Sequence, residues 1–141
     1  MRPLVAEDYA SCLLLWASCD RTAVRMWEDP TSLMRLIDHN PSICSAAEQD
    51  GRLVGALLAG QDGARGWLYH VAVDEAWRRR GIGSSLVSRA LVELAKVHIQ
   101  RVHVVMLSTN LGSMRFWTAG AWRPREDLSL LSIDLDSPQL N

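Results

Sequence analysis

The stretch from Trp67 to Val97 constrains the fold more than any other part of the chain. It begins with an apolar run, Trp67 to Val73, which is rich in β-forming residues and therefore predicts a strand. It ends with apolar residues spaced three and four apart, which predict an amphipathic helix. These residues are Leu86, Val87, Ala90, Leu91, Leu94 and Val97. A short basic, glycine-containing segment joins the two elements.

The joining segment has the composition of an anion-binding loop. Its residues are Arg78, Arg79, Arg80, Gly81, Ile82, Gly83, Ser84 and Ser85. The first backbone N–H groups of a helix have no partner within the helix, and the peptide dipoles place partial positive charge there. Gly81 and Gly83 allow the backbone to bend and a phosphate to approach, while the arginines add donors. The sequence therefore predicts a pyrophosphate site.

Two better-known phosphate loops do not match these residues. A P-loop requires a lysine after its second glycine, and a dinucleotide fingerprint requires a third glycine where this chain has Leu86. The pattern R-x-x-G-x-G after a strand that ends in V-A-V instead resembles the acetyl-CoA signature of the GNAT acetyltransferase superfamily. The preceding segment, GQDGARGWLYH over residues 60–70, is similar to small bacterial members of the YpeA-like subgroup.

The resemblance implies an α/β fold of one GNAT domain over residues 1–141. This fold has a central mixed sheet with a splayed pair of parallel strands, flanked by helices. Only residues 1–5 remain for the first strand, so we expect it to be short or missing. Residues 101–107 form an apolar, β-branched run, which predicts a parallel neighbour of the strand over 67–73, joined by a right-handed crossover.

The resemblance also assigns the acetyl-CoA contacts, because the pantetheine arm of CoA enters the gap between the two parallel strands. The implied contact residues are Val71, Ala72, Val73, Arg78, Arg79, Arg80, Gly81, Ile82, Gly83, Ser84, Ser85, Asn110 and Trp117. Strand backbone beside the gap has no ladder partner, so Val71 and Val73 are expected to pair with the pantetheine amides.

Other elements follow from local signals. Periodic apolar residues predict a first helix within 4–18, and Asp29-Pro30 marks the start of a second helix. Asp50-Gly51 predicts a hairpin turn between strands over 43–48 and 53–59. Gly55 inside the latter strand favours a bulge. Asn110 suits the N-cap of a short helix, and the apolar segment 128–135 predicts a last strand.

Composition excludes several classes of protein. A length of 141 residues suits one domain, and a net charge of −1 gives no general attraction to nucleic acid or an anionic membrane. No apolar run approaches the roughly 20 residues of a membrane span, and the N-terminus lacks a long apolar region, so we expect a cytoplasmic protein. The three cysteines and four histidines lack ligand or disulfide spacing. No metal is expected.

Acetyl transfer from a thioester to an amine requires a neutral amine, a donor to the developing oxyanion and a proton for the thiolate. The resemblance implies that a backbone N–H near Val71 supplies the oxyanion donor. Relatives often add a strand glutamate and a tyrosine on the last helix. Here the glutamate positions fall on Trp67 or Val105, and Trp117 replaces the tyrosine. An indole is a donor but no useful acid.

Tyr69 and His70 remain as the catalytic candidates, with His103 and Ser108 on the neighbouring strand. The two-residue period of a strand predicts that Tyr69 and His70 lie on opposite faces, so that at most one of them faces the thioester. Each also has a structural interpretation, as a packed aromatic side chain or a core histidine. Acetyl transfer by positioning alone, with water as proton relay, stays open.

Trp27 is the candidate for acceptor binding, because it lies in a charged loop between the first two helices; a solvated loop is the alternative. We expect an acetyl-CoA-dependent N-acetyltransferase acting on a primary amine of a small molecule, peptide or protein. A non-catalytic CoA-binding module is the rival hypothesis, and nucleic-acid binding by Arg78 to Arg80 is disfavoured by the net charge. A homodimer is compatible with the resemblance.

Overall fold

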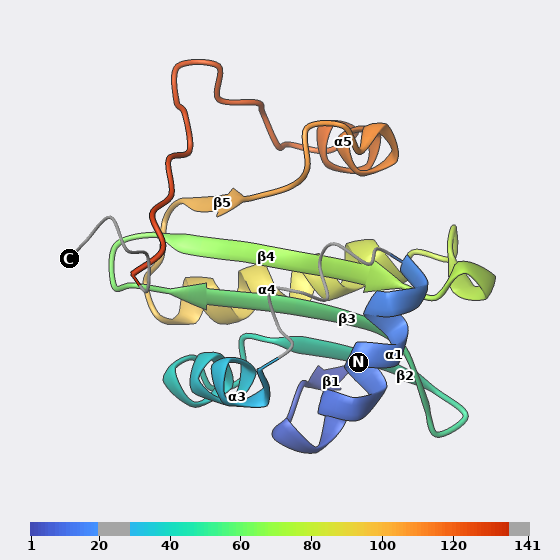
Figure 1. Cartoon of the computed structure of the whole chain (residues 1–141). Helices are drawn as coiled ribbons and strands as arrows, with labels where there is room; N and C mark the ends of the chain where they lie inside the picture. The colour runs from blue at the N-terminus through green and yellow to red at the C-terminus, as the bar shows by residue number, and fades with distance from the viewer. Residues whose placement is uncertain (20–28, 136–141) are drawn as a thin grey trace. The chain divides into compact units, whose positions relative to one another are not determined.

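A five-stranded mixed sheet is the framework of the first of two structural units, which spans Met1–Met106. The computed structural model describes residues 1–19 and 29–135, and Figure 1 shows its strands and helices. The sheet order is β1-β2-β3-β4-β5. The strands are β1 (Arg2–Pro3), β2 (Ser45–Gln49), β3 (Arg52–Gln61), β4 (Gly66–Val73) and β5 (Val102–Val104). The predicted α/β class with a mixed sheet is confirmed.

Strand directions agree with the sequence-based expectation. Neighbouring strands from β1 to β4 are antiparallel, whereas β5 runs parallel to β4 after the crossover through α4 (Ile82–Lys96). The first strand is short, as predicted, and pairs with β2 through two residues only. Asp50 and Gly51 both have positive φ, 52° and 74°, which is the backbone of a tight hairpin turn.

Helices cover both faces of the sheet. The short 3-10 helix η1 (Ala6–Asp8) leads into α1 (Tyr9–Cys19), and α3 (Pro30–His39) begins at the predicted position. Asp29 caps α3 by accepting a hydrogen bond from Thr31 N at 2.9 Å. Buried residues of α1 and α3 pack on one face of the sheet. The apolar side of α4 packs on the other, although the helix ends at Lys96 and the exposed Val97 lies outside it.

The second unit begins at Leu107 and contains α5 (Leu111–Thr118). Asn110 is its N-cap, as predicted, and accepts a hydrogen bond from Ser113 N at 3.0 Å. The predicted last strand over 128–135 is wrong, because residues 128–135 form no strand. A strand requires a neighbour for its backbone groups, and the described part of this unit offers no other strand. The large apolar side chains of residues 128–135 are exposed: Leu128, Leu130, Leu131, Ile133 and Leu135.

Gly55 allows α4 to lie close to the sheet. The register between β2 and β3 passes from Ala47–Gly55 to Glu48–Leu53, so the predicted bulge exists and its extra residue is the neighbouring Val54. A Cβ atom on Gly55 would lie 3.0 Å from both Ile82 Cγ2 and Leu86 Cδ1. Any larger residue therefore requires the Ile82 and Leu86 side chains in the first turns of α4 to shift.

Gly55→Ala tests this packing. We expect a loss of about 1–3 kcal/mol in the free energy of unfolding, because the added methyl group overpacks a site without room for it. Urea denaturation measures the change. Gly112→Ala in α5 is the control, since its Cβ would meet only Asn110 Oδ1 at 3.7 Å. Equal stability of Gly55→Ala and wild type would contradict the interpretation.

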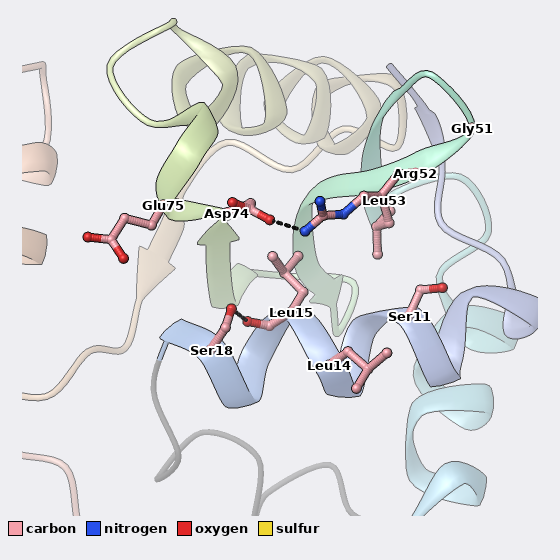
Figure 2. A pocket seen from close by; sticks show the side chains of 9 residues that line it. All are labelled: Ser11, Leu14, Leu15, Ser18, Gly51, Arg52, Leu53, Asp74 and Glu75. Atoms are coloured by element: carbon pink, nitrogen blue, oxygen red, sulfur yellow. Dashed lines mark hydrogen bonds and ion pairs between the residues drawn. The ribbon is translucent and has the colours of Figure 1, made fainter.

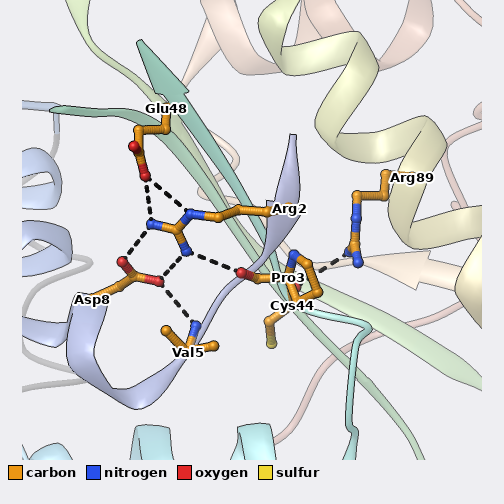
Figure 3. Close-up of polar contacts among 7 residues, drawn as sticks. All are labelled: Arg2, Pro3, Val5, Asp8, Cys44, Glu48 and Arg89. Carbon is orange, nitrogen blue, oxygen red and sulfur yellow. Dashed lines mark hydrogen bonds and ion pairs between the residues drawn. The ribbon is translucent and has the colours of Figure 1, made fainter. Parts of the chain in front are cut away.

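An ion-pair network holds the short first strand in place (Figure 3). Arg2 donates to both carboxylate oxygens of Asp8, at 2.7 and 2.8 Å, and its Nε donates to Glu48 Oε2 at 3.1 Å. Asp8 also accepts a hydrogen bond from Val5 N at 2.9 Å. The hydrogen bonds from Arg2 lower the pKa of Asp8, and they outweigh the opposing effect of partial burial. The network compensates for a strand with only two ladder pairs.

Asp8→Asn makes the network testable by pH. The folded pKa of Asp8 lies below its unfolded value of about 3.9, so its stabilisation is present above about pH 4 and is lost as pH falls through the folded pKa. We expect Asp8→Asn to be less stable than wild type by about 1–2 kcal/mol near neutral pH. Urea denaturation at several pH values should show this difference shrinking below about pH 4. A difference that stays constant to pH 2 would contradict the assignment.

Candidate active site

The edge of β4 that faces β5 is paired along only part of its length. The ladder joins Gly66, Trp67 and Leu68 to residues 102–104. Val105 N donates the last backbone bond, to Leu68 O at 3.3 Å. Because β4 continues to Val73, its last five residues extend beyond this pairing. The gap expected between the parallel strands therefore begins after Leu68.

The hydrogen-bond alternation of β3 and β4 shows which backbone groups face this gap. Asp74 N donates to Val54 O at 2.8 Å, so these two residues form a hydrogen-bonded antiparallel pair. The next pair, Val73 with Gly55, is then of the other kind, and the backbone groups of Val73 point away from β3. Val71 has the same orientation two residues earlier. Ala72, in contrast, directs its backbone groups toward β3, and its side chain is buried.

The glycine loop leads directly from this strand to α4. Arg79 and Gly81 have positive φ, 60° and 77°. Gly81 is the N-cap of α4, and no side chain caps the helix there. A left-handed φ favours glycine at this position. The first intrahelical bond runs from Ser85 N to Gly81 O at 3.0 Å. The N–H groups of residues 82–84 therefore precede the helix ladder and are suited to bind an anion.

The three arginines of the loop have different surroundings. Arg78 turns back to β4, where its Nε donates to Val73 O at 3.0 Å and its Nη2 lies 3.6 Å from the Cys19 Sγ. The Arg80 guanidinium lies 4.8 Å from the ring centre of Trp77, a cation–π contact. Arg79 is exposed. The sequence predicted that all three arginines donate hydrogen bonds to the pyrophosphate. In the structure, Arg78 also connects the end of β4 to the end of α1.

A bulge at Tyr69 changes the faces of the two catalytic candidates. Leu58 pairs with His70 and Ala59 pairs with Leu68, so Tyr69 is an extra residue in β4. Tyr69 packs against the core cluster that contains Trp16 of α1, and the His70 ring lies 5.6 Å from the Trp16 ring. The expectation of opposite faces is wrong, because the bulge interrupts the two-residue alternation. Both side chains lie on the α1 face.

Tyr69 is protonated at neutral pH. Burial raises the pKa of its phenol, and the Asp62 carboxylate and the Cys44 thiol add smaller effects in the same direction. A protonated phenol can donate to a leaving group. The third candidate, His103, lies beside Trp67 with ring centres 4.9 Å apart, in the paired part of β4 and β5.

The other predicted residues lie elsewhere in the chain. Trp27 is outside the described residues. Asn110 and Trp117 belong to the second unit, where Asn110 caps α5 and Trp117 is buried between Phe116 and Trp122. Ser108 lies in the same unit and is exposed. Val105, one of the two positions expected to match a strand glutamate, is exposed.

A hollow of about 470 Å³ lies beside α1 and the β2–β3 turn (Figure 2). Its lining residues are Ser11, Leu14, Leu15, Ser18, Gly51, Arg52, Leu53, Asp74 and Glu75. Arg52 Nη2 and Asp74 Oδ2, both from lining residues, form an ion pair at 2.6 Å. None of the sequence-predicted site residues lines this hollow, so it is separate from the candidate active site.

Cys12 and Cys44 are buried. Burial raises the pKa of Cys12 to about 12 and that of Cys44 to about 11, so both thiols are neutral. Within 1–19 and 29–135, no three His, Cys, Asp or Glu side chains are grouped to hold a metal ion. None of the helices in these ranges has the length and apolar composition needed to cross a membrane.

The amino-acid sequence of this chain matches known acetyltransferases. The acetyltransferase (GNAT) family matches residues 5–121. A protein named acetyltransferase from Pectobacterium atrosepticum is 32% identical over 105 residues, which cover 74% of this chain and 73% of that protein. Another from Yersinia enterocolitica is 31% identical over 111 residues, covering 78% and 77%.

Solved structures show the same fold. Ard1 from Thermoplasma volcanium superposes with a TM-score of 0.74 at 19% identity, over 84% of this chain and 78% of that one. The aminoglycoside N-acetyltransferase AAC(6')-Iy, solved in complex with CoA, gives a TM-score of 0.72 at 14% identity, over 92% and 91%. With a family match over most of its length and a sheet that separates after Leu68 beside a glycine loop, this chain belongs to the GNAT acetyltransferase family.

Proposed function

We propose that this protein transfers the acetyl group of acetyl-CoA directly to a primary amine of a small molecule, peptide or protein. The observation that supports this function best is the open edge of β4, which ends at the glycine loop and the start of α4. An extended chain with amide groups can pair with such an edge, and its anionic end then meets free helix N–H groups.

The residues of this edge fit acetyl-CoA, which supplies the activated acetyl group as a thioester when it is bound. Val71 offers its backbone N–H and C=O to the pantetheine amides, and Val73 offers its N–H, since the Val73 carbonyl accepts from Arg78 Nε. The N–H groups of residues 82–84 offer the pyrophosphate site, and Arg79 adds an exposed positive charge. In this proposal the two units act as one domain of residues 1–141, in which Asn110 and Trp117 also contact the cofactor.

Catalysis in this proposal uses side chains on the α1 face. The amine nitrogen attacks the thioester carbonyl, and the Val71 N–H stabilises the oxyanion. The carbon–sulfur bond then breaks, and the thiolate takes the proton of the Tyr69 hydroxyl. The acetylated amine loses a proton to His70 or to water. A cytoplasmic location, where acetyl-CoA is available, belongs to the same proposal.

A second candidate function is a non-catalytic module that binds CoA. The observation that favours it is the buried Trp117, which stands at the family tyrosine position and packs between two aromatic rings. An indole cannot protonate a thiolate efficiently. Release of free CoA in the presence of an amine panel distinguishes the enzyme from the module.

Gly83→Glu tests the cofactor site. CoA should raise the melting temperature of the wild-type protein, and Gly83→Glu should abolish this rise because it places bulk and negative charge at the anion site. Arg79→Ala should only weaken binding, since the backbone N–H groups remain. A thermal shift titration measures all three proteins. A wild-type protein that does not respond to millimolar CoA would refute the proposed cofactor.

Tyr69→Phe tests the proton donor. Removal of the hydroxyl should lower the turnover number about 10² to 10⁴-fold and leave the CoA-induced thermal shift unchanged. His70→Gln is the comparison, because it removes the imidazole that could accept the amine proton on the same face. Wild-type turnover by Tyr69→Phe would mean that Tyr69 only packs and that water or the ammonium product supplies the proton.

A further inference from the structure

The Arg78 side chain folds back onto the strand from which its loop begins. Its Nε donates to Val73 O at 3.0 Å, and its Nη2 donates to Cys19 Sγ at 3.6 Å. The Cys19 thiol in turn donates to Val73 O at 3.5 Å. The three groups are therefore in mutual contact. A carbonyl oxygen has two lone pairs, so the Val73 carbonyl already has both of its donors from the protein itself.

These contacts direct the Arg78 guanidinium to the ends of β4 and α1. The sequence predicted that Arg78 donates to the pyrophosphate, but its Nε and Nη2 both have protein acceptors. Arg79 is exposed and leaves at the loop a positive charge that does not depend on Arg78. The role of Arg78 therefore has to be sought in the bond that it makes to the strand.

The loop that follows Arg78 contains a backbone conformation that needs support. Arg79 has a φ of 60°, in the left-handed region, where a residue with a Cβ atom is disfavoured. Such a conformation persists where the surrounding contacts fix the chain. On the strand side, Asp74 caps the short 3-10 helix η2 (Glu75–Trp77), and Arg78 then binds back to Val73. Both contacts hold the chain just before the left-handed residue.

The Arg78–Val73 bond lies between the two parts of the proposed cofactor site. The pantetheine amides pair with β4 as far as the Val73 N–H, whereas the pyrophosphate binds the N–H groups of residues 82–84. The bond closes the chain segment from 73 to 78, which leads from one part to the other. A ligand that binds both parts gains affinity when their separation is fixed beforehand, because less entropy is lost on binding. A ligand that binds one part gains nothing from this bond.

We propose that Arg78 is a positioning residue, which sets the separation of the pantetheine and pyrophosphate parts through the bond from its Nε to Val73 O and not through its charge. The inference rests on the proposed binding of acetyl-CoA. It also limits the part of β4 that the ligand can use, because Val73 contributes its N–H but not its carbonyl. The alternative is that Arg78 binds the pyrophosphate as a cation.

Two substitutions separate the hydrogen bond from the charge. In Arg78→Gln, the side-chain amide nitrogen is the same number of bonds from Cα as the arginine Nε, so it can donate to Val73 O without a charge. In Arg78→Lys, a methylene group takes this place and the charge is kept. Arg101→Gln and Arg101→Lys are the matched controls, because Arg101 is exposed and precedes β5.

Isothermal titration with CoA and with ADP distinguishes the two roles. CoA has both parts, whereas ADP has a pyrophosphate without pantetheine. We expect Arg78→Lys to bind CoA about tenfold more weakly than wild type and to bind ADP within about twofold of wild type. Arg78→Gln should bind both ligands within about threefold of wild type. The Arg101 variants should bind both ligands as wild type does.

A charge contact would give the opposite order, with Arg78→Gln weaker than Arg78→Lys for CoA, and would overturn the inference. Wild-type CoA affinity in Arg78→Lys, or an equal loss for CoA and ADP, would also overturn it. Thermal melting of the free variants is the folding control, and loss of CoA binding by a folded Arg78→Gln variant is decisive even where Arg78→Lys does not fold. The proposed function fails differently: the wild type binds no CoA, which removes the inference as well, or it binds CoA and releases none with any amine.

Discussion

The end of the β5 pairing at Leu68 of β4 is the constraint on which the arrangement of the site depends. Backbone N–H and C=O groups of a strand require partners, and β5 provides them only as far as Leu68. Arg78 satisfies one of the remaining groups, the Val73 carbonyl, from the loop that follows. Val71, which directs its backbone groups away from β3, can pair with a ligand that is itself a peptide-like chain. In the proposed function, the end of this pairing sets the position and the direction of cofactor binding.

Local signals allowed much of the fold to be predicted. Apolar periodicity located β4 and α4, Asp50-Gly51 located the hairpin turn, and Asp29 and Asn110 located helix starts. Each of these signals acts within a few residues, where propensity and capping dominate. The predicted last strand over 128–135 failed because a strand depends on a neighbour, and composition says nothing about whether one is present.

The site shows the same division between local and distant causes. The glycine loop was predicted because its function resides in consecutive residues. The bulge at Tyr69 could not be predicted, since it arises from the register with Leu58 and Ala59 on β3. The contacts of Arg78 with Val73 and Cys19 also join distant parts of the chain.

The two halves of the site differ in which part of the chain they use. Cofactor binding, as proposed, uses backbone groups of β4 and of the first turn of α4, and these groups are present with almost any side chain. Recognition of an acceptor depends on side chains, which substitution changes at once. A shared fold therefore retains its acyl donor while its acceptor varies. For this reason the family assignment indicates acetyl transfer but not the acceptor, which has to be inferred from the side chains around the site.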